Sequence, residues 1–400
     1  MRGVPYCFFY SKIVIIVVMK AYKFKLKTSQ TVRDKLELTL NLCRELYNSA
    51  LRERIDAYRI NHVSVSYQDQ QNQLPEIKLI RDDLKAVYSQ VLQDALKRLD
   101  KTFAAFFGRV NRGEKAGFPR FKSQNRYDSF TFPSASGGYR LDGNDLFLSK
   151  IGKVKIRLSR AMVGKVKTLT IKREVSGWFA IFTVETEKEI LPKTGKSIGI
   201  DAGIESFMTL SDGTQIENFK YFEASQKQLR VAGRKVSRRK KSSNQRRKAV
   251  LRLRKIHAQI KNQRNDFAHK VSTNLVKEYD LIAIENLNIL GMSKGILAKE
   301  IHDVAWNSFY QKLKYKAENA GKSVVEVNPN GTSQTCICGA RVEKTLAQRQ
   351  HICLKCGHSE HRDIVSAKVI LSRAGQTRKD VTYAVGQSVS LESPSIITSI

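Results

Sequence analysis

The sequence has no apolar run of the roughly 20 residues that a membrane-spanning helix requires. The nearest candidate, residues 7–18, is shorter, is interrupted by Lys12, and is not followed by a convincing small-residue site at which a signal peptide would be cleaved. A membrane partner is therefore not expected. We expect translation to start at Met19, which would make residues 1–18 an upstream extension of the reading frame.

Cysteine is also scarce, with six residues in 400, and its arrangement is not that of a disulfide framework. Four of the six lie within residues 336–356, while Cys7 and Cys43 are isolated. Clustered thiols of this kind are typical of a metal site in a reducing compartment. The cytoplasm is the simplest such location.

Acidic residues are few relative to basic ones. Asp and Glu total 37 against 71 Lys and Arg, which gives a net charge of +34. This excess is larger than solubility requires and indicates a polyanionic partner, with nucleic acid the first candidate. A membrane surface is the alternative, which the lack of a spanning segment disfavours. The length of 400 residues and the 41% hydrophobic fraction predict a globular protein of two or three domains.

The first half of the chain combines strand and helix patterns. Residues 21–27 alternate apolar and basic side chains, as does a strand with one buried and one positive face, and residues 146–186 contain three more alternating segments. Apolar residues recur with helical spacing over residues 32–55 and again over about 79–107. We predict a small β-barrel over residues 19–190, with lysines outside and a helical lobe inserted at about 29–110.

Residues 117–123 interleave basic and aromatic side chains, including Arg120 and Lys122. Such a segment suits a nucleic-acid surface, because cations meet phosphates and rings stack on bases. A loop that docks its rings onto the barrel is an equal alternative.

Three carboxylates stand next to apolar runs that are far apart in the sequence. Residues 197–213 predict a buried strand that ends at Asp201, followed by a second strand and a turn. Residues 281–284 are a second apolar run, and Glu285 follows it directly. Asp363 stands just before the apolar residues 364–371. Each acid alone is more typical of a cap, a turn or the surface. Three brought together suit divalent metal ions held against a phosphodiester, and we predict a catalytic α/β core.

The most basic region, residues 227–255, also has an apolar stripe at helical spacing. Residues 242–244 interrupt it, so we predict a helical hairpin over about 224–278 with one face along a nucleic-acid backbone. A further helix over 305–320 and a strand over 324–327 complete the core, and residues 375–400 are predicted to be a flexible tail. The candidate nucleic-acid-binding residues of the hairpin are Arg238, Arg239, Lys240, Arg246 and Arg247.

The clustered cysteines form two knuckles, each followed by glycine, as in a zinc ribbon. The first knuckle has a one-residue spacer and the second has the usual two, and three nearby histidines are close enough to join or rearrange the metal shell. The predicted zinc is structural, and Asp363 follows the second knuckle so closely that ribbon folding and active-site assembly are expected to be coupled. The four thiol ligands are Cys336, Cys338, Cys353 and Cys356; the histidines are His351, His358 and His361.

Taken together, the segments SIGIDAGIESFMTLSDG, HAQIKNQRNDFAHK, LIAIENLNILGM, NGTSQTC, CLKCG with HRD, and GFPRFKS resemble the TnpB (OrfB) proteins of bacterial insertion sequences, relatives of the compact type V CRISPR effectors. The resemblance covers residues 19 to about 370. It implies a RuvC-like nuclease core of RNase H fold over residues 191–374, with a zinc ribbon at about 332–360. It also implies that the barrel and helical lobe read the adjacent motif and support the heteroduplex.

The implied activity is RNA-guided DNA cleavage beside a transposon-adjacent motif, with a guide RNA from the element end and a double-stranded DNA target. Asp201, Glu285 and Asp363 correspond to the RuvC carboxylates that hold two Mg²⁺ ions, and the four cysteines correspond to the zinc ligands. We expect a cytoplasmic, nucleoid-associated chain that acts as a monomer.

Three departures from the family pattern keep other functions open. The first knuckle is one residue short, His361 stands where an acid is usual, and Val365 stands where asparagine is usual. A nuclease-impaired RNA-guided DNA-binding protein or repressor is one alternative. A transposase that joins strands itself, or an accessory transposition factor, is another, although the sequence has no visible tyrosine-nucleophile context or separate integration domain.

Overall fold

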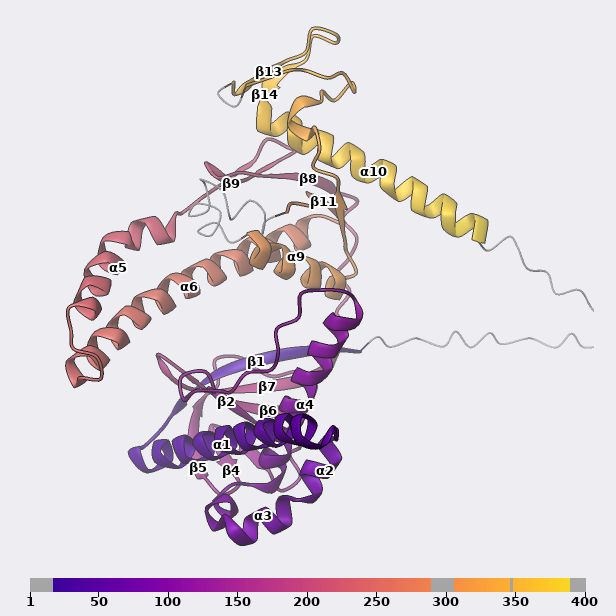
Figure 1. The fold of residues 1–400 in the computed structure, drawn as a ribbon. Helices are drawn as coiled ribbons and strands as arrows, with labels where there is room; N and C mark the ends of the chain where they lie inside the picture. Colours follow the sequence, from indigo (N-terminus) through magenta and orange to yellow (C-terminus); the bar gives the residue numbers. More distant parts are fainter. Residues whose placement is uncertain (1–16, 289–305, 346–347, 389–400) are drawn as a thin grey trace, which may run out of the picture. The chain divides into compact units, whose positions relative to one another are not determined.

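The structure is a computed structural model that describes residues 17–288, 306–345 and 348–388. The chain divides into two compact units, Met1–Lys188 and Glu189–Ile400, which are described separately below (Figure 1). Within the described ranges, no helix is both long and apolar enough to cross a membrane.

The first unit is built on a seven-stranded antiparallel sheet in the order β2-β6-β7-β1-β5-β4-β3. The edge strands β2 and β3 approach each other through the rings of Phe132 and Tyr139, whose centroids are 6.2 Å apart, so the sheet is a nearly closed barrel. The strands are β1 (Val17–Lys27), β2 (Ser129–Phe132), β3 (Tyr139–Asp142), β4 (Asp145–Leu148), β5 (Gly152–Arg157), β6 (Lys165–Glu174) and β7 (Gly177–Glu187).

The alternation of side chains explains this sheet. Phe24 and Leu26 of β1 are buried in the core, whereas the lysines between and after them are exposed. The strands predicted over residues 21–27 and within 146–186 are confirmed. The four-residue strands β2 and β3 were not predicted, because neither is long enough to give a clear alternating pattern.

The lobe that follows β1 consists of two long helices and three short ones. The long helices are α1 (Gln30–Asn61) and α4 (Ser89–Asn111), and the short ones are α2 (Tyr67–Asn72), α3 (Leu74–Ile80) and the 3₁₀ helix η1 (Asp82–Ala86). The prediction of one continuous helix from about residue 79 was wrong. Val87 and Tyr88 have extended backbones that separate η1 from α4. Val87 is buried, and the Tyr88 ring stacks on Phe132. The Tyr88 hydroxyl also donates to Ser136 O at 2.9 Å. Tertiary packing therefore overrides the helical spacing at this point.

The second unit contains a five-stranded mixed sheet in the order β10-β9-β8-β11-β12. β8, β11 and β12 are mutually parallel, and β9 runs antiparallel between β8 and β10. The predicted strands ending at Asp201 and Glu285 are confirmed. The bounds are β8 (Ser197–Ala202), β9 (Ser206–Leu210), β10 (Gln215–Glu217), β11 (Leu281–Glu285) and β12 (Ser323–Val327).

Helices cover both faces of this sheet. α6 (Asn244–Glu278) and α9 (Trp306–Ala320) pack on the face that carries Ile200 and Ile284, whereas α10 (Arg362–Ser388) packs on the face of Ala283 (Figure 1). α5 (Tyr221–Ser237) pairs with α6 as the predicted helical hairpin. Ala305, at the start of the predicted helix, lies outside the described residues.

The segment predicted as a flexible tail from residue 375 is helical as far as Ser388, where α10 ends; residues 389–400 lie outside the described ranges. Between β12 and α10 lies a small cysteine-bearing module with η2 (Thr332–Gln334), β13 (Gln350–Ile352) and β14 (Ser359–His361). β14 ends at the residue before α10 begins. The module and the helix that carries Asp363 are therefore covalently continuous.

A charged pair at the start of β11 ties the sheet to the segment that precedes β8. The Lys322 side chain is 2% exposed, pairs with Asp280 and donates to Pro192 O at 2.6 Å. Asp280 also accepts from the backbone amides of Thr194 and Gly195. These contacts hold the pKa of Asp280 well below its usual range, with the Lys322 hydrogen bond the largest cause.

Candidate metal centres and nucleic-acid surfaces

Asp201 and Glu285 lie at the same end of two neighbouring parallel strands. Ile200 of β8 is opposite Ile284 of β11, so the next residue in each strand is an acid. Adjacent strands are about 4.8 Å apart, and residues in register point to the same face. Each acid follows an apolar run in the sequence, and the parallel register places the two carboxylates, of Asp201 and Glu285, side by side at the same edge of the sheet.

Asp363 reaches this edge from α10 because Gly199 allows a close approach. A Cβ at Gly199 would lie 2.0 Å from Ala367 O and 2.9 Å from Leu371 Cβ. Asp201 is two residues beyond Gly199 on the same sheet face, and Asp363 is one helical turn before Ala367 on the same helix side. The negative charges of Glu285 and Asp363 both act on Asp201.

The electrostatics of this acid cluster are unfavourable without a cation. Burial raises the pKa of Asp201 well above its ordinary value, and Glu285 and Asp363 raise it further, with only Arg362 opposing. Burial also raises the pKa of Glu285, which is 8% exposed. Three oxygen-donor groups whose ionised forms repel one another are suited to divalent cations.

Neighbouring side chains hold the acids in place. Thr332 donates its hydroxyl to Glu285 Oε1 at 2.5 Å, and Arg362 Nε lies 3.3 Å from Asp363 Oδ1. Arg349 bridges two segments: its Nη2 lies 2.6 Å from Glu205 Oε2, and its Nη1 lies 4.0 Å from Asp363 Oδ2.

Sequence reasoning missed Thr332, Arg349 and Arg362 as parts of this site. Thr332 lies within the segment NGTSQTC, and the two arginines flank the second knuckle, but one more threonine or arginine in a basic chain carries no individual signal. Their positions depend on how the cysteine module folds against the sheet.

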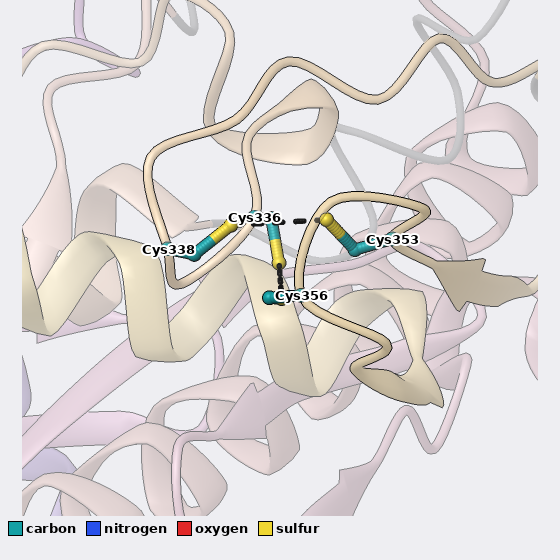
Figure 2. Close-up of side chains that lie close together, drawn as sticks. All are labelled: Cys336, Cys338, Cys353 and Cys356. Atoms are coloured by element: carbon teal, nitrogen blue, oxygen red, sulfur yellow. Dashed lines mark hydrogen bonds between the residues drawn. The ribbon is translucent and has the colours of Figure 1, made fainter.

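The four cysteine thiols point toward one another (Figure 2). Their sulfurs all lie within 4.8 Å of one another, and the pairs Cys336–Cys356 and Cys338–Cys353 are both 3.7 Å apart. A tetrahedral zinc ion with Zn–S bonds of about 2.3 Å separates its sulfurs by about 3.8 Å. The one-residue spacer of the first knuckle therefore still permits a four-thiol arrangement.

The nearby histidines do not belong to this group of thiols. His351 is fully buried, with Lys344 Nζ at its Nδ1, and its Nε2 has no partner within the described residues. His358 Nε2 lies 3.1 Å from Glu360 Oε2, and the backbone amide of Asp363 donates to His361 Nδ1 at 3.4 Å. His361 thus caps the start of α10, where the family pattern has an acid.

In the loop over residues 117–123, one ring packs on α4 of the helical lobe and not on the barrel, and contact of this loop with nucleic acid stays a prediction. Phe118 packs edge-on against Phe103 and Phe106, with centroids 5.8 and 5.4 Å apart, but half of it remains exposed. Phe121 is 48% exposed. Arg120 is also exposed, while the Lys122 backbone is held by Asn48 through hydrogen bonds of 2.8 and 3.0 Å.

The five hairpin candidates gather around the turn between α5 and α6, but they are not equivalent. Arg238, Arg239, Lys240 and Arg247 are exposed. Arg246 donates from Nη1 to Val236 O at 2.8 Å and to Arg239 O at 3.4 Å, so its guanidinium caps the end of α5. Their contact with nucleic acid stays a prediction.

Comparison with family models gives three matches along the chain. Residues 181–295 match the OrfB_IS605 family, described as "Probable transposase", and residues 306–370 match the Cas12f1-like TNB domain. Residues 18–62 match a helix-turn-helix domain of OrfB_IS605 proteins, although here they form β1 and α1.

Two relatives match nearly the whole chain. "Putative RNA-guided DNA endonuclease InsQ" of Escherichia coli (strain K12) is 31% identical, covering 88% of this chain and 92% of the relative. "Putative RNA-guided DNA endonuclease" of Streptomyces pristinaespiralis is 33% identical, covering 89% of each. The solved Cas12f1–sgRNA–target DNA complex is similar in fold, with a TM-score of 0.55 and 14% identity over 86% of this chain and 83% of that chain.

Proposed function

The chain belongs to the TnpB (OrfB) family, and we propose that it is a transposon-encoded RNA-guided DNA endonuclease that cuts DNA beside a transposon-adjacent motif. Full-length similarity to relatives named as RNA-guided DNA endonucleases supports this activity. The net charge of +34 is consistent with guide RNA and double-stranded DNA as partners. We propose that one copy of the chain acts with one guide.

The observation that carries the proposal is the convergence of Asp201, Glu285 and Asp363 at one edge of the second sheet. These three carboxylates would hold two Mg²⁺ ions, which when bound activate a water and stabilise the leaving 3′ oxygen. Thr332 fixes the orientation of Glu285, and Arg362 and Arg349 supply positive charge beside Asp363.

The second unit would then be a RuvC-like nuclease core of RNase H fold over residues 191–374, followed by the remainder of α10. Its mixed sheet with helices on both faces is consistent with that assignment. Residues 332–360 would be an inserted zinc ribbon, supported by the fit of the thiol separations to a tetrahedral ion. The barrel of residues 19–190, with its helical lobe, would support the guide–target duplex.

Cleavage by the whole chain tests the proposal. The protein is co-expressed with RNA from its neighbouring element end and assayed with Mg²⁺ and a guide-matched DNA, beside the variant Asp201→Ala. We expect guide-dependent cutting by the wild type, and guided binding without cutting by the variant. Equal cutting by both proteins would refute the assigned acid cluster.

One observation favours a second candidate, a nuclease-impaired RNA-guided binder or repressor. Val365 is 1% exposed and apolar, so it offers no polar group beside Asp363. Guided binding by the wild type without cutting would support this candidate. Joining of synthetic element ends in the absence of guided cutting would instead support a strand-transferring transposase.

A further inference from the structure

A cleft in the helical lobe takes no part in the function proposed above. It lies between α1 and the short helices α2, α3 and η1, with one residue from α4, and its volume is about 280 Å³. Pockets for small organic ligands begin at about 300 Å³. The cleft is therefore large enough for one small ligand.

The carboxylate of Glu53 is the charged group of this cleft that has no opposite charge beside it. Gln70 Nε2 donates to Glu53 Oε2 at 2.7 Å, and Gln73 Nε2 donates to Glu53 Oε1 at 3.0 Å. Both partners are neutral amides, and among the described residues Glu53 makes no ion pair. Cations are not scarce, since the chain has 71 Lys and Arg. A half-buried carboxylate of this kind retains its attraction for a cation.

The amides that hold this carboxylate are fixed in place. Gln70 is 1% exposed; its Nε2 also donates to Ala50 O at 2.9 Å, and its Oε1 accepts from Arg54 Nε at 2.9 Å. α2, which carries Gln70, begins with a capping box formed by Ser66 and Asp69. The acceptor is thus oriented before any ligand arrives, which lowers the cost of binding.

Hydrocarbon lines the cleft beside the carboxylate. Leu46, Leu84 and Leu96 are buried lining residues. Leu46 and Glu53 are seven residues apart on α1, which places them two turns, or about 10 Å, apart along one face of the helix. An occupant therefore meets a negative charge at one end and apolar side chains along its length.

The other charges of the lining exclude an anionic occupant. Arg81 is already engaged by two acids, Glu45 at 3.1 Å and Asp83 at 2.6 Å. Two acids and one base line the cleft, so its charge is negative in a chain whose net charge is +34. This polarity is opposite to that of a phosphate-binding site.

We propose that this site, which we call the Glu53 cleft (Leu46, Glu53, Gln70, Gln73, Leu84 and Leu96), binds a small primary aliphatic amine. The ammonium would donate charge-assisted hydrogen bonds to Glu53, and the alkyl chain would pack on the three leucines. The proposal is independent of the nuclease activity and gives the lobe a small-molecule site. The net positive charge of the chain disfavours adventitious binding of the same cation elsewhere.

The test compares two series of ligands on the nucleic-acid-free full chain. The probes are n-alkylamines from ethylamine to hexylamine and the matching n-alcohols, with Kd values measured by ligand-observed NMR. We expect butylamine to bind with a Kd on the order of 1 mM. Each added CH₂ should lower Kd about three- to fourfold until the cleft is filled. The alcohols should bind roughly tenfold more weakly, because they lack the charge.

Glu53→Gln removes the negative charge at nearly constant size. We expect it to weaken amine binding by about tenfold or more and to leave alcohol binding within about twofold of the wild type. Retained alcohol binding shows that the variant is folded. The matched control is Glu76→Gln, because Glu76 is an exposed acid of α3 that does not line the cleft. It should bind both series as the wild type does.

Ser49→Phe tests the location of the site without altering its charge. Ser49 is an exposed lining residue, so a ring there should obstruct the cleft and abolish binding of both series. Equal amine affinities in Glu53→Gln and the wild type, or affinities that do not rise with chain length, would overturn the proposal. Tighter binding of Nα-acetyl-lysine methylamide than of butylamine would also overturn it, because the occupant would then be a lysine side chain of a protein partner. None of these outcomes affects guided cleavage, which is assayed separately.

Discussion

Asp201 is a residue whose effects on stability and on cleavage should have opposite signs. Its pKa is raised in the folded protein, so the folded state binds the proton more tightly and ionisation at neutral pH costs folding stability. Asp201→Asn removes that charge at nearly constant volume. In metal-free buffer at pH 7 we expect Tm to rise by roughly 2 to 6 °C, while guided cleavage in Mg²⁺ falls to background.

Asp266→Asn is the control for this comparison. Asp266 is 65% exposed and pairs with Lys270 on the surface of α6, where an ion pair contributes little. Its Tm and cleavage should match the wild type. A lowered Tm for Asp201→Asn would mean that the carboxylate stabilises the fold, which contradicts the repulsive acid cluster described above.

The Asp280–Lys322 pair should respond asymmetrically to removal of either partner. Asp280→Asn leaves a Lys322 side chain that is 2% exposed without its counter-charge, and we expect Tm to fall by on the order of 10 °C. Lys322→Met replaces the buried ammonium by an apolar chain of similar length and should cost much less. Equal losses in the two variants by calorimetry would contradict this account.

The same pair predicts how acid affects stability. The pKa of Asp280 is lowered by Lys322 and by the amides of Thr194 and Gly195. Its contribution is therefore fully present above the unfolded-state value of about 4 and is lost as pH falls through the lower folded-state pKa. Below about pH 4, the thermal midpoint Tm should therefore fall less steeply with decreasing pH in Asp280→Asn than in the wild type.

At the scale of elements, the cysteine module should determine whether α10 presents Asp363 correctly. β14 leads directly into α10, and Arg349 from this module contacts both Glu205 and the Asp363 carboxylate. Cys353→Ser should reduce bound zinc from about one ion per chain and abolish cleavage, because thiolate ligands fold such modules. Zinc content, limited proteolysis of residues 332–361 and guided cleavage measure the three effects.

Cys43→Ser is the control, because it removes a thiol that is not among the four predicted zinc ligands. Cys43 is buried in the helical lobe of the first unit and lies outside the thiol cluster. It should retain zinc even though burying a hydroxyl lowers stability. Full zinc content and normal cleavage in Cys353→Ser would contradict the coupling of this module to the active site.

These elements also mark what local sequence can predict. β8 and β11 were predictable because an apolar run that ends in an acid is a pattern within a few residues. The extended pair Val87–Tyr88 was not, because contacts with Phe132 and Ser136 decide its conformation. Arg246 was predicted to bind nucleic acid, but nothing near it in the sequence indicated that it would cap α5.

At the acid cluster, too, features within a few residues could be predicted, whereas contacts between residues far apart in the sequence could not. The acids Asp201, Glu285 and Asp363 could be proposed from local patterns and family resemblance. Their grouping at one sheet edge depends on parallel register and on the absence of a Cβ at Gly199, which only the fold reveals. Arg349 depends on the fold to an even greater extent, since its contacts come from segments 144 and 14 residues away.

At the scale of the whole molecule, positive charge is shared evenly. Residues 1–188 contain 35 basic and 18 acidic residues, and residues 189–400 contain 36 and 19, so each unit carries half of the net charge of +34. Binding to nucleic acid should therefore draw on both units. A single basic patch would involve only a few phosphates, whereas two basic units permit many simultaneous phosphate contacts.

This distribution predicts a steep salt dependence for the free chain. We expect affinity for random-sequence duplex DNA to fall by about 10³-fold or more between about 50 and 200 mM salt, as for proteins that contact at least about six phosphates. Prior loading with its RNA should reduce the slope, because many of the cations are then already occupied. A shallow slope for the free chain, unchanged by RNA, would mean that the charge is dispersed for solubility and does not form a binding surface.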